Sequence, residues 1–147
     1  MIGPSSSHTA GAARIAYLAQ KMIAGPLVRV EFILYGSFAR TYRGHGTDRA
    51  LLGGIMGFDT DDERIRDSFS IAQERGIDFS FTPNGEETEV HPNTVDIHMV
   101  NGSGQELTVR GILKRSSSDD EGKAGKNTLP SQKAIQLQKW FPFPLRW

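Results

Sequence analysis

A short segment near the start of the chain, GPSSSHT at residues 3–9, gathers groups that can bind and protonate a small ligand. It carries four hydroxyl side chains: Ser5, Ser6, Ser7 and Thr9. One hydroxyl is enough to cap a helix, and the first turn of a helix also offers unpaired backbone N–H groups that favour an anion such as a carboxylate. His8 titrates near neutral pH and suits proton transfer. The segment therefore predicts a carboxylate site, although an ordinary serine-rich cap explains its composition equally well.

A second polar segment, GHGTD at residues 44–48, precedes another expected helix. Glycines on both sides of His45 allow the backbone to approach a ligand closely and leave the imidazole accessible. Asp48 can orient an imidazole or complete the cap of the helix. An ordinary loop with Thr47 as the capping residue accounts for the segment equally well when it is taken alone.

A third segment, HPNT at residues 91–94, places a proline between two polar side chains. Pro92 stiffens the backbone, so His91 and Asn93 are held in a fixed relation to each other. Taken alone, the segment is more typical of a turn before a strand. In the strand that follows, His98 alternates with apolar residues and is expected to face solvent.

Three of the histidines lie in expected loops and can in principle converge on a zinc ion: His8, His45 and His91. No His-x-His or His-x-x-x-His spacing supports such a site. The chain also has no cysteine, so it cannot supply a disulfide, a thiolate zinc site or the ligands of an iron–sulfur cluster. We therefore predict no metal site in this chain.

The elements that must position these segments follow from hydrophobic periodicity. Apolar residues at helical spacing predict three helices: from Ser7 or His8 to Gly25, from Thr47 to about Met56, and a third that contains Ile65, Phe69 and Ala72 and ends at Gly76. Alternation predicts strands near residues 27–35, 77–81, 95–100 and 107–111. Helices that come early and antiparallel strands that come late indicate an α+β fold, with helices packed on a mostly antiparallel sheet.

Composition narrows the class of protein. The 147 residues suit one domain, and 17 basic residues balance 17 acidic residues. A neutral chain gives no electrostatic reason to expect a nucleic acid or a membrane as partner. No apolar stretch is long enough to span a bilayer and no secretory signal is visible, so a cytoplasmic protein is expected.

The last part of the chain differs in composition from the rest. Residues 116–127 contain Ala124 as their only apolar residue, which favours disorder. Residues 132–140 are expected to form a short helix. We therefore divide the chain into a domain at residues 1–113 and an atypical, disordered tail at residues 114–147.

Taken together and in this order, the three polar segments are far more specific than any one of them. Three stretches carry a resemblance: MIGPSSSHTAGAARIA at residues 1–16, VRVEFILYGSFARTYRGHGTDRALLGGIMG at residues 28–57, and HPNT at residues 91–94. On these stretches, residues 1 to about 111 resemble the beta subunit of bacterial iron–sulfur-dependent L-serine dehydratase, also called L-serine ammonia-lyase. The family has a first strand that this chain is expected to lack, and the tail resembles neither the family nor its regulatory ACT domain.

The resemblance implies the conversion of L-serine to pyruvate and ammonia, a lyase reaction of serine breakdown. It also implies a fold similar to the allosteric substrate-binding domain of phosphoglycerate dehydrogenases. The oxygen-sensitive [4Fe–4S] cluster is expected on a partner alpha subunit and not on this chain, which agrees with the absence of cysteine from the sequence. The chain is therefore expected to act as one subunit of a heteromer and not to be active alone.

For this reaction, His8 is expected to move the α-proton of L-serine. Hydroxyl and helix N–H groups of four residues are expected to hold the substrate carboxylate: Ser5, Ser6, Ser7 and Thr9. Four more residues are expected to line the same pocket: His45, Asp48, His91 and Asn93. Two other functions stay open on the residues alone, namely a non-catalytic module that binds or senses serine, and a domain that binds phosphate or sulfate.

Overall fold

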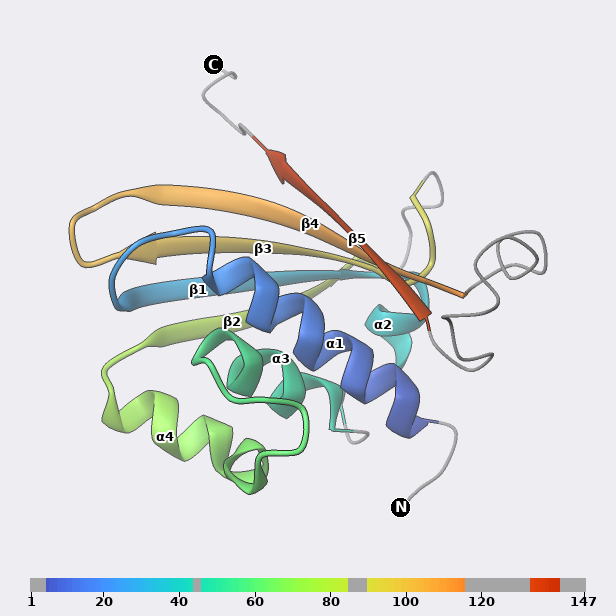
Figure 1. Ribbon diagram of the computed structural model, residues 1–147, viewed down its shortest axis with the longest axis horizontal. Helices are drawn as coiled ribbons and strands as arrows, with labels where there is room; N and C mark the ends of the chain where they lie inside the picture. The colour runs from blue at the N-terminus through green and yellow to red at the C-terminus, as the bar shows by residue number, and fades with distance from the viewer. Residues whose placement is uncertain (1–4, 44–45, 85–89, 116–132, 141–147) are drawn as a thin grey trace, which may run out of the picture.

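The computed structural model describes residues 5–43, 46–84, 90–115 and 133–140 (Figure 1). The helices are α1 (Ser5–Gln20), α2 (Gly36–Thr41), α3 (Thr47–Ile55), the 3-10 helix η1 (Glu63–Asp67) and α4 (Ser68–Glu74). The strands are β1 (Leu27–Tyr35), β2 (Asp78–Asn84), β3 (Thr94–Asn101), β4 (Glu106–Arg115) and β5 (Lys133–Trp140).

The strands form one sheet with the order β2-β1-β3-β4-β5. β1 and β2 are parallel, because α2, α3 and α4 lie between them in the chain and supply the crossover that a parallel pair requires. The other three pairs are antiparallel, and residues 101–105 close the hairpin between β3 and β4. The predicted α+β fold with a mostly antiparallel sheet is confirmed. The likeness to the phosphoglycerate dehydrogenase domain stays a prediction.

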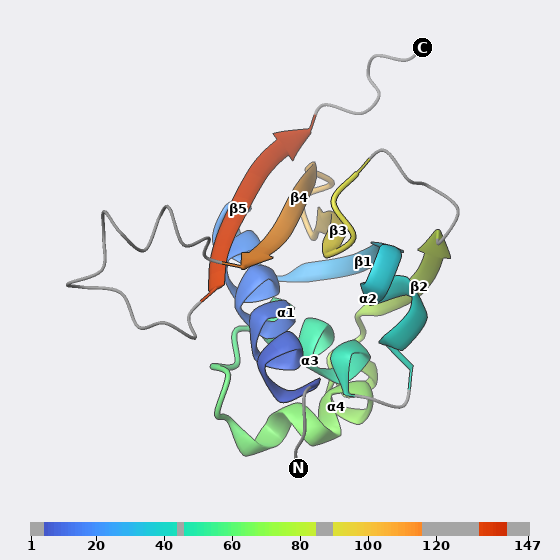
Figure 2. The same cartoon turned by 90° about the vertical axis from the view of Figure 1, so that its right-hand side faces the viewer.

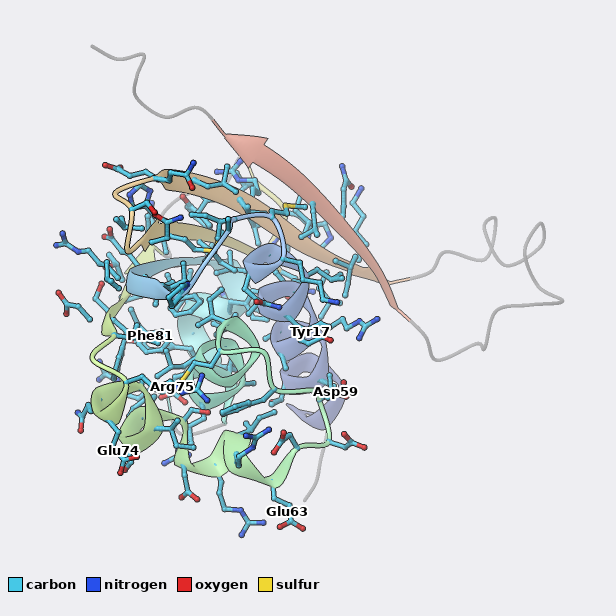
Figure 3. The ribbon with its side chains drawn as sticks, turned by 60° about the vertical axis from the view of Figure 1, so that its left-hand side comes forward. Tyr17, Asp59, Glu63, Glu74, Arg75 and Phe81 are labelled. Carbon is cyan, nitrogen blue, oxygen red and sulfur yellow. The ribbon has the colours of Figure 1, made fainter. Side chains whose placement is uncertain are left out.

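The hydrophobic core lies between one face of the sheet and the helices α1, α3 and α4 (Figure 2). Alternate residues of the two central strands point into it and are fully buried: Val30, Phe32 and Leu34 from β1, and Val95, Ile97 and Met99 from β3. The parallel strand adds aromatic rings, and the Phe81 ring stacks on Phe32 at a centroid distance of 5.0 Å, between the sheet and the helices (Figure 3). The alternating sequence therefore encodes strands with one buried face.

Helix α1 packs closely against both α3 and the sheet because glycines remove side chains at the contacts. A Cβ atom on Gly54 of α3 would overlap the backbone carbonyl of Ala13 in α1. A Cβ atom on Gly111 of β4 would overlap the side chain of Ile15. The position of α1 is therefore set by direct contact with the backbone of its neighbours.

The opposite face of the sheet carries a buried polar network that joins β1, β3 and β4. The Tyr35 hydroxyl donates to Asp96 at 2.9 Å, and the Arg110 guanidinium donates to both oxygens of the same carboxylate at 2.7 and 3.0 Å. Burial, and then the negative charge of Asp96, raise the pKa of Tyr35 to about 12. The network is paired internally, so its role in this chain is to hold three strands together.

Two helix predictions need correction at their ends. The first helix begins at Ser5 and not at Ser7 or His8. It ends at Gln20 and not near Gly25, because Lys21 and Met22 donate to carbonyls three residues back and so tighten and close the last turn. The expected third helix is divided into η1 and α4.

The tail contains a clear error of prediction. Residues 133–140 form strand β5 and not a helix, and they pair antiparallel with β4. Ile135 and Leu137 alternate with glutamines in the manner of a strand, and both pack on the core. The edge of β4 supplies the hydrogen-bond partners of β5, and the alternation in the tail does not show which strand they belong to. The disorder predicted for residues 116–127 lies outside the described residues, and the division at residue 113 stays a prediction.

Within the described ranges, no helix has the length and apolar character needed to cross a membrane.

The contact between α1 and α3 can be tested with Gly54→Ala. Alanine normally stabilises a helix by roughly 1 kcal/mol relative to glycine. At this position we expect the variant to lose about 2 kcal/mol of unfolding free energy in urea, because the new methyl group must push the two helices apart. Gly102→Ala is the control, since its Cβ would meet nothing nearer than 4.0 Å. Equal stability of Gly54→Ala and the parent chain would contradict the contact.

Candidate functional site

The first turns of α1 and α3 lie next to each other at one end of the molecule. The Thr9 methyl group is 3.9 Å from the position that a Cβ atom would take on Gly46, the residue that precedes α3. Thr9 is half-buried and has a hydrogen bond or other polar contact within the protein. The chain therefore places Thr9 of the first polar segment beside Gly46 of the second polar segment.

The start of α3 differs from the prediction in one respect. Gly46, with a φ of +85°, is the N-cap residue, and Thr47 is the first residue of the helix, where its side chain caps nothing. Asp48 accepts the backbone N–H of Arg49 at 2.8 Å, and its own N–H donates to the Tyr42 carbonyl at 3.3 Å. Asp48 thus places a carboxylate at the positive end of the helix, which is a favourable position for it.

The third polar segment forms a turn before β3 that Asn93 fastens to two other elements. The Asn93 side chain accepts from the Ser37 hydroxyl at 2.5 Å and donates to the Leu113 carbonyl at 3.2 Å. The backbone carbonyl of Asn93 also accepts from the Leu113 N–H at 2.9 Å. Asn93 therefore holds the turn between the start of α2 and the end of β4.

His91 lies in the same turn as a neutral hydrogen-bond acceptor. Its Nδ1 accepts the backbone N–H of Asn93 at 3.0 Å, and its carbonyl accepts from the Thr94 hydroxyl at 2.6 Å. Burial, and then the nearby charge of Lys114, lower the pKa of His91 below its ordinary value of 6.5. The lowered pKa agrees with the hydrogen bond, since a protonated Nδ1 could not accept it.

Leu113 links this turn to α1. It bonds to Asn93 through its backbone, and its side chain fills the space where a Cβ atom on Gly11 would lie. Gly11 is two residues from Thr9, so one side of α1 contacts Leu113 and another side contacts the start of α3 near the same helix end. The structure thus places Thr9 beside Gly46 at the start of α3 and links Asn93 to α1 through Leu113, while a shared site for these residues stays a prediction.

The remaining predicted residues lie outside what the structure describes. These are His45 and the side chains of Ser5, Ser6, Ser7 and His8. The described residues contain no group of three or more histidine, aspartate or glutamate side chains arranged to hold a metal ion. The conceivable zinc site of three histidines is not tested, because two of its members are among the undescribed side chains.

Sequence reasoning missed two groups at this end of the molecule. Ser37 was not singled out, although it follows a glycine directly after a buried strand. Thr47 was identified only as a cap, although it lies inside the second polar segment and is fully buried. The sequence does show a threonine between a glycine-flanked histidine and an aspartate, but only the structure shows that this threonine is buried.

Two other features lie away from this site. A pocket of about 340 Å³ lies at the opposite end of β1, and its lining includes Gln20, Leu27, Met56 and Arg75 (Figure 3) but none of the predicted site residues. His98 lies on the sheet face away from the helices, as predicted, but it is half-buried and not free in solvent. Its Nδ1 is 2.7 Å from the Thr108 hydroxyl, and its Nε2 is 3.2 Å from Glu106.

Comparison with known proteins assigns the family. Residues 1–113 match the family described as serine dehydratase beta chain. The chain belongs to this family. It is 50% identical over 111 residues to the L-serine dehydratase beta chain of Peptoniphilus asaccharolyticus, and 50% identical over 112 residues to the probable L-serine dehydratase beta chain of Bacillus subtilis.

The family match covers part of each relative. The two beta chains align with 76% of this chain and with 50% of their own lengths, so the chain spans about half the length of these relatives. L-serine dehydratase 1 of Escherichia coli is 33% identical over 124 residues, which are 69% of this chain and 27% of the relative. All three polar segments lie within the region matched to the serine dehydratase beta chain family.

In this member of the serine dehydratase beta chain family, His91 should make the fold sensitive to acid. The lowered pKa means that the unfolded chain binds the His91 proton more tightly, so stability is lost as the pH falls through 6.5 towards the pKa of the folded state. We expect His91→Asn, whose amide oxygen can replace Nδ1 as acceptor, to lose less stability between pH 7.5 and 5.5. Urea unfolding at several pH values measures this, with His98→Asn as the matched control. An unchanged pH dependence in His91→Asn would contradict the assignment.

Proposed function

We propose that the chain is the beta-chain part of an L-serine dehydratase, which converts L-serine to pyruvate and ammonia together with an alpha subunit. Membership of the serine dehydratase beta chain family supports this, as do the names of the relatives in Peptoniphilus and Bacillus. The single observation that supports the proposal is that Thr9 of the first family segment lies beside Gly46 of the second, while Asn93 of the third is linked to α1 through Leu113.

The reaction needs a group that holds the substrate and a group that moves a proton. We propose that the hydroxyls of the first segment and the N–H groups at the start of α1 bind the carboxylate of L-serine. His8 then takes the α-proton and the hydroxyl leaves the β-carbon as hydroxide, so that the proton and the hydroxide together make up the water that is lost. A [4Fe–4S] cluster on the alpha subunit would supply a Lewis acid that assists the loss of hydroxide. The 2-aminoacrylate that results becomes an imine, and water hydrolyses it to pyruvate and ammonia without further catalysis.

The turn at residues 91–94 would contribute to this site by helping to place its residues. Asn93 uses both ends of its side-chain amide in bonds to Ser37 and Leu113, so it acts on the substrate through the placement of the turn. His91 is neutral and half-buried in the same turn. A carboxylate held by hydroxyl and N–H donors at this end of the molecule would meet no buried negative charge in the turn.

The residues of this chain do not fit a [4Fe–4S] cluster, because thiolates are its usual ligands and the chain has no cysteine. We propose that the cluster expected from the family resemblance has its ligands on the alpha subunit. The hydroxyls of the first segment and His8 therefore serve substrate binding and proton transfer, and not the binding of the cluster.

The proposal is tested with the alpha subunit and this chain combined, by measuring pyruvate formation from L-serine. We expect His8→Gln to lower kcat by about 10²–10⁴-fold, the usual contribution of a general base. His98→Gln is the control, because His98 lies on the sheet face away from the site, and it should keep full activity.

Two other results would redirect the assignment. Full turnover by His8→Gln would exclude its role in proton transfer. Binding of L-serine by the combined subunits without any pyruvate formation would instead favour a non-catalytic serine-sensing module, which is the main alternative for this family segment.

A further inference from the structure

The Thr47 hydroxyl stands out among the polar groups of the described part of the chain. Thr47 is 0% exposed, and its Oγ is the one buried side-chain oxygen or nitrogen there that has no hydrogen-bond partner. Buried polar groups in folded proteins are almost always paired, because an unpaired hydroxyl loses its bonds to water and gains nothing in return. The unpaired group therefore calls for a physical explanation.

The position of Thr47 in the helix does not explain why its hydroxyl is unpaired. A buried threonine within a helix usually bonds back to a carbonyl three or four residues earlier, and a threonine at the N-cap bonds forward to an N–H. Thr47 does neither, because Gly46 takes the N-cap position and leaves Thr47 as the first residue of α3. Valine has nearly the same shape and would fill this space without an unpaired hydroxyl.

The surroundings of Thr47 point to a ligand. The two N–H groups that follow it are already used, since Asp48 donates to the Tyr42 carbonyl and Arg49 donates to the Asp48 carboxylate. The Thr47 hydroxyl is a buried donor without a partner at the positive end of α3, and the adjacent residue Gly46 lies beside Thr9. The Asp48 carboxylate at this helix start bonds to the Arg49 N–H, so the buried Thr47 hydroxyl is left to donate to a further acceptor such as the carboxylate of a ligand.

We propose that the Thr47 hydroxyl binds the carboxylate of the amino-acid substrate and is paired only when the substrate is present. This inference rests on the proposed function and adds a substrate-binding residue from the start of α3 to the hydroxyls of the first segment. It assigns to Thr47 a contact with the substrate and not a cap. The free protein is then less stable than it would be with valine at this position.

Two variants separate the hydroxyl from the shape of the side chain. Thr47→Val keeps the shape and removes the hydroxyl, and Thr47→Ser keeps the hydroxyl and removes the methyl group. Without substrate, we expect Thr47→Val to unfold at the same or a higher temperature than the parent chain, and Thr47→Ser at a lower one. With the alpha subunit present, Thr47→Val should raise the Kd for L-serine about tenfold, which corresponds to about 1.4 kcal/mol, and Thr47→Ser should change it little.

L-Alanine identifies the group that Thr47 contacts, because it has the carboxylate of L-serine and lacks the hydroxyl. Thr47→Val should weaken the binding of L-alanine and L-serine by the same factor. A loss confined to L-serine would overturn the assignment to the carboxylate, and equal L-serine binding by Thr47→Val and the parent protein would overturn the inference as a whole. If the parent complex binds no L-serine, the proposed function fails together with this inference.

Discussion

The arrangement of this domain depends on how closely α1 approaches its neighbours. Three glycines make the approach possible: Gly11 in α1, Gly54 in α3 and Gly111 in β4. At each of them, the space of a missing Cβ atom is filled by an atom from the element opposite. Because close-packed interiors leave little room for a helix to shift, α1 can neither rotate nor slide without a clash. The start of α1 is therefore fixed relative to the start of α3.

The contacts of α1 also fix its position relative to the sheet. Leu113 fills the space beside Gly11 and is bonded through its backbone to Asn93, whose side chain also bonds to Ser37. One residue of β4 thus connects the first helix to the turn before β3 and, through it, to the start of α2. The candidate site consequently lies where helix starts and strand ends meet, and its geometry depends on backbone contacts more than on long side chains. This favours a preorganised arrangement of donors, which is what substrate binding and proton transfer require.

Local patterns in the sequence account for much of this fold. The alternation over residues 27–35 predicts β1 with the bounds that the structure shows, because half of its residues enter the core and half do not. The helical spacing of apolar residues likewise predicts α1 and α3. The pairing of β5 with β4 escapes prediction because 17 residues separate the two strands in sequence, between Arg115 and Lys133. The bonds of Asn93 to Ser37 and Leu113 escape it for the same reason, since they join residues 56 and 20 positions apart.

The error at Thr47 has a different origin, and it bears on the site. Threonine before a helical apolar run is typical of an N-cap, and the sequence offers no means to see that the glycine before it adopts a φ of +85° and takes that place. Because the N-cap lies one residue earlier than predicted, the Thr47 side chain does not cap the helix, and its hydroxyl has no hydrogen-bond partner within the described chain. Proteins commonly retain such a cost to stability at functional sites. The position where the local rule fails therefore coincides with the end of the molecule where the family segments meet, and that coincidence links the fold to the proposed chemistry.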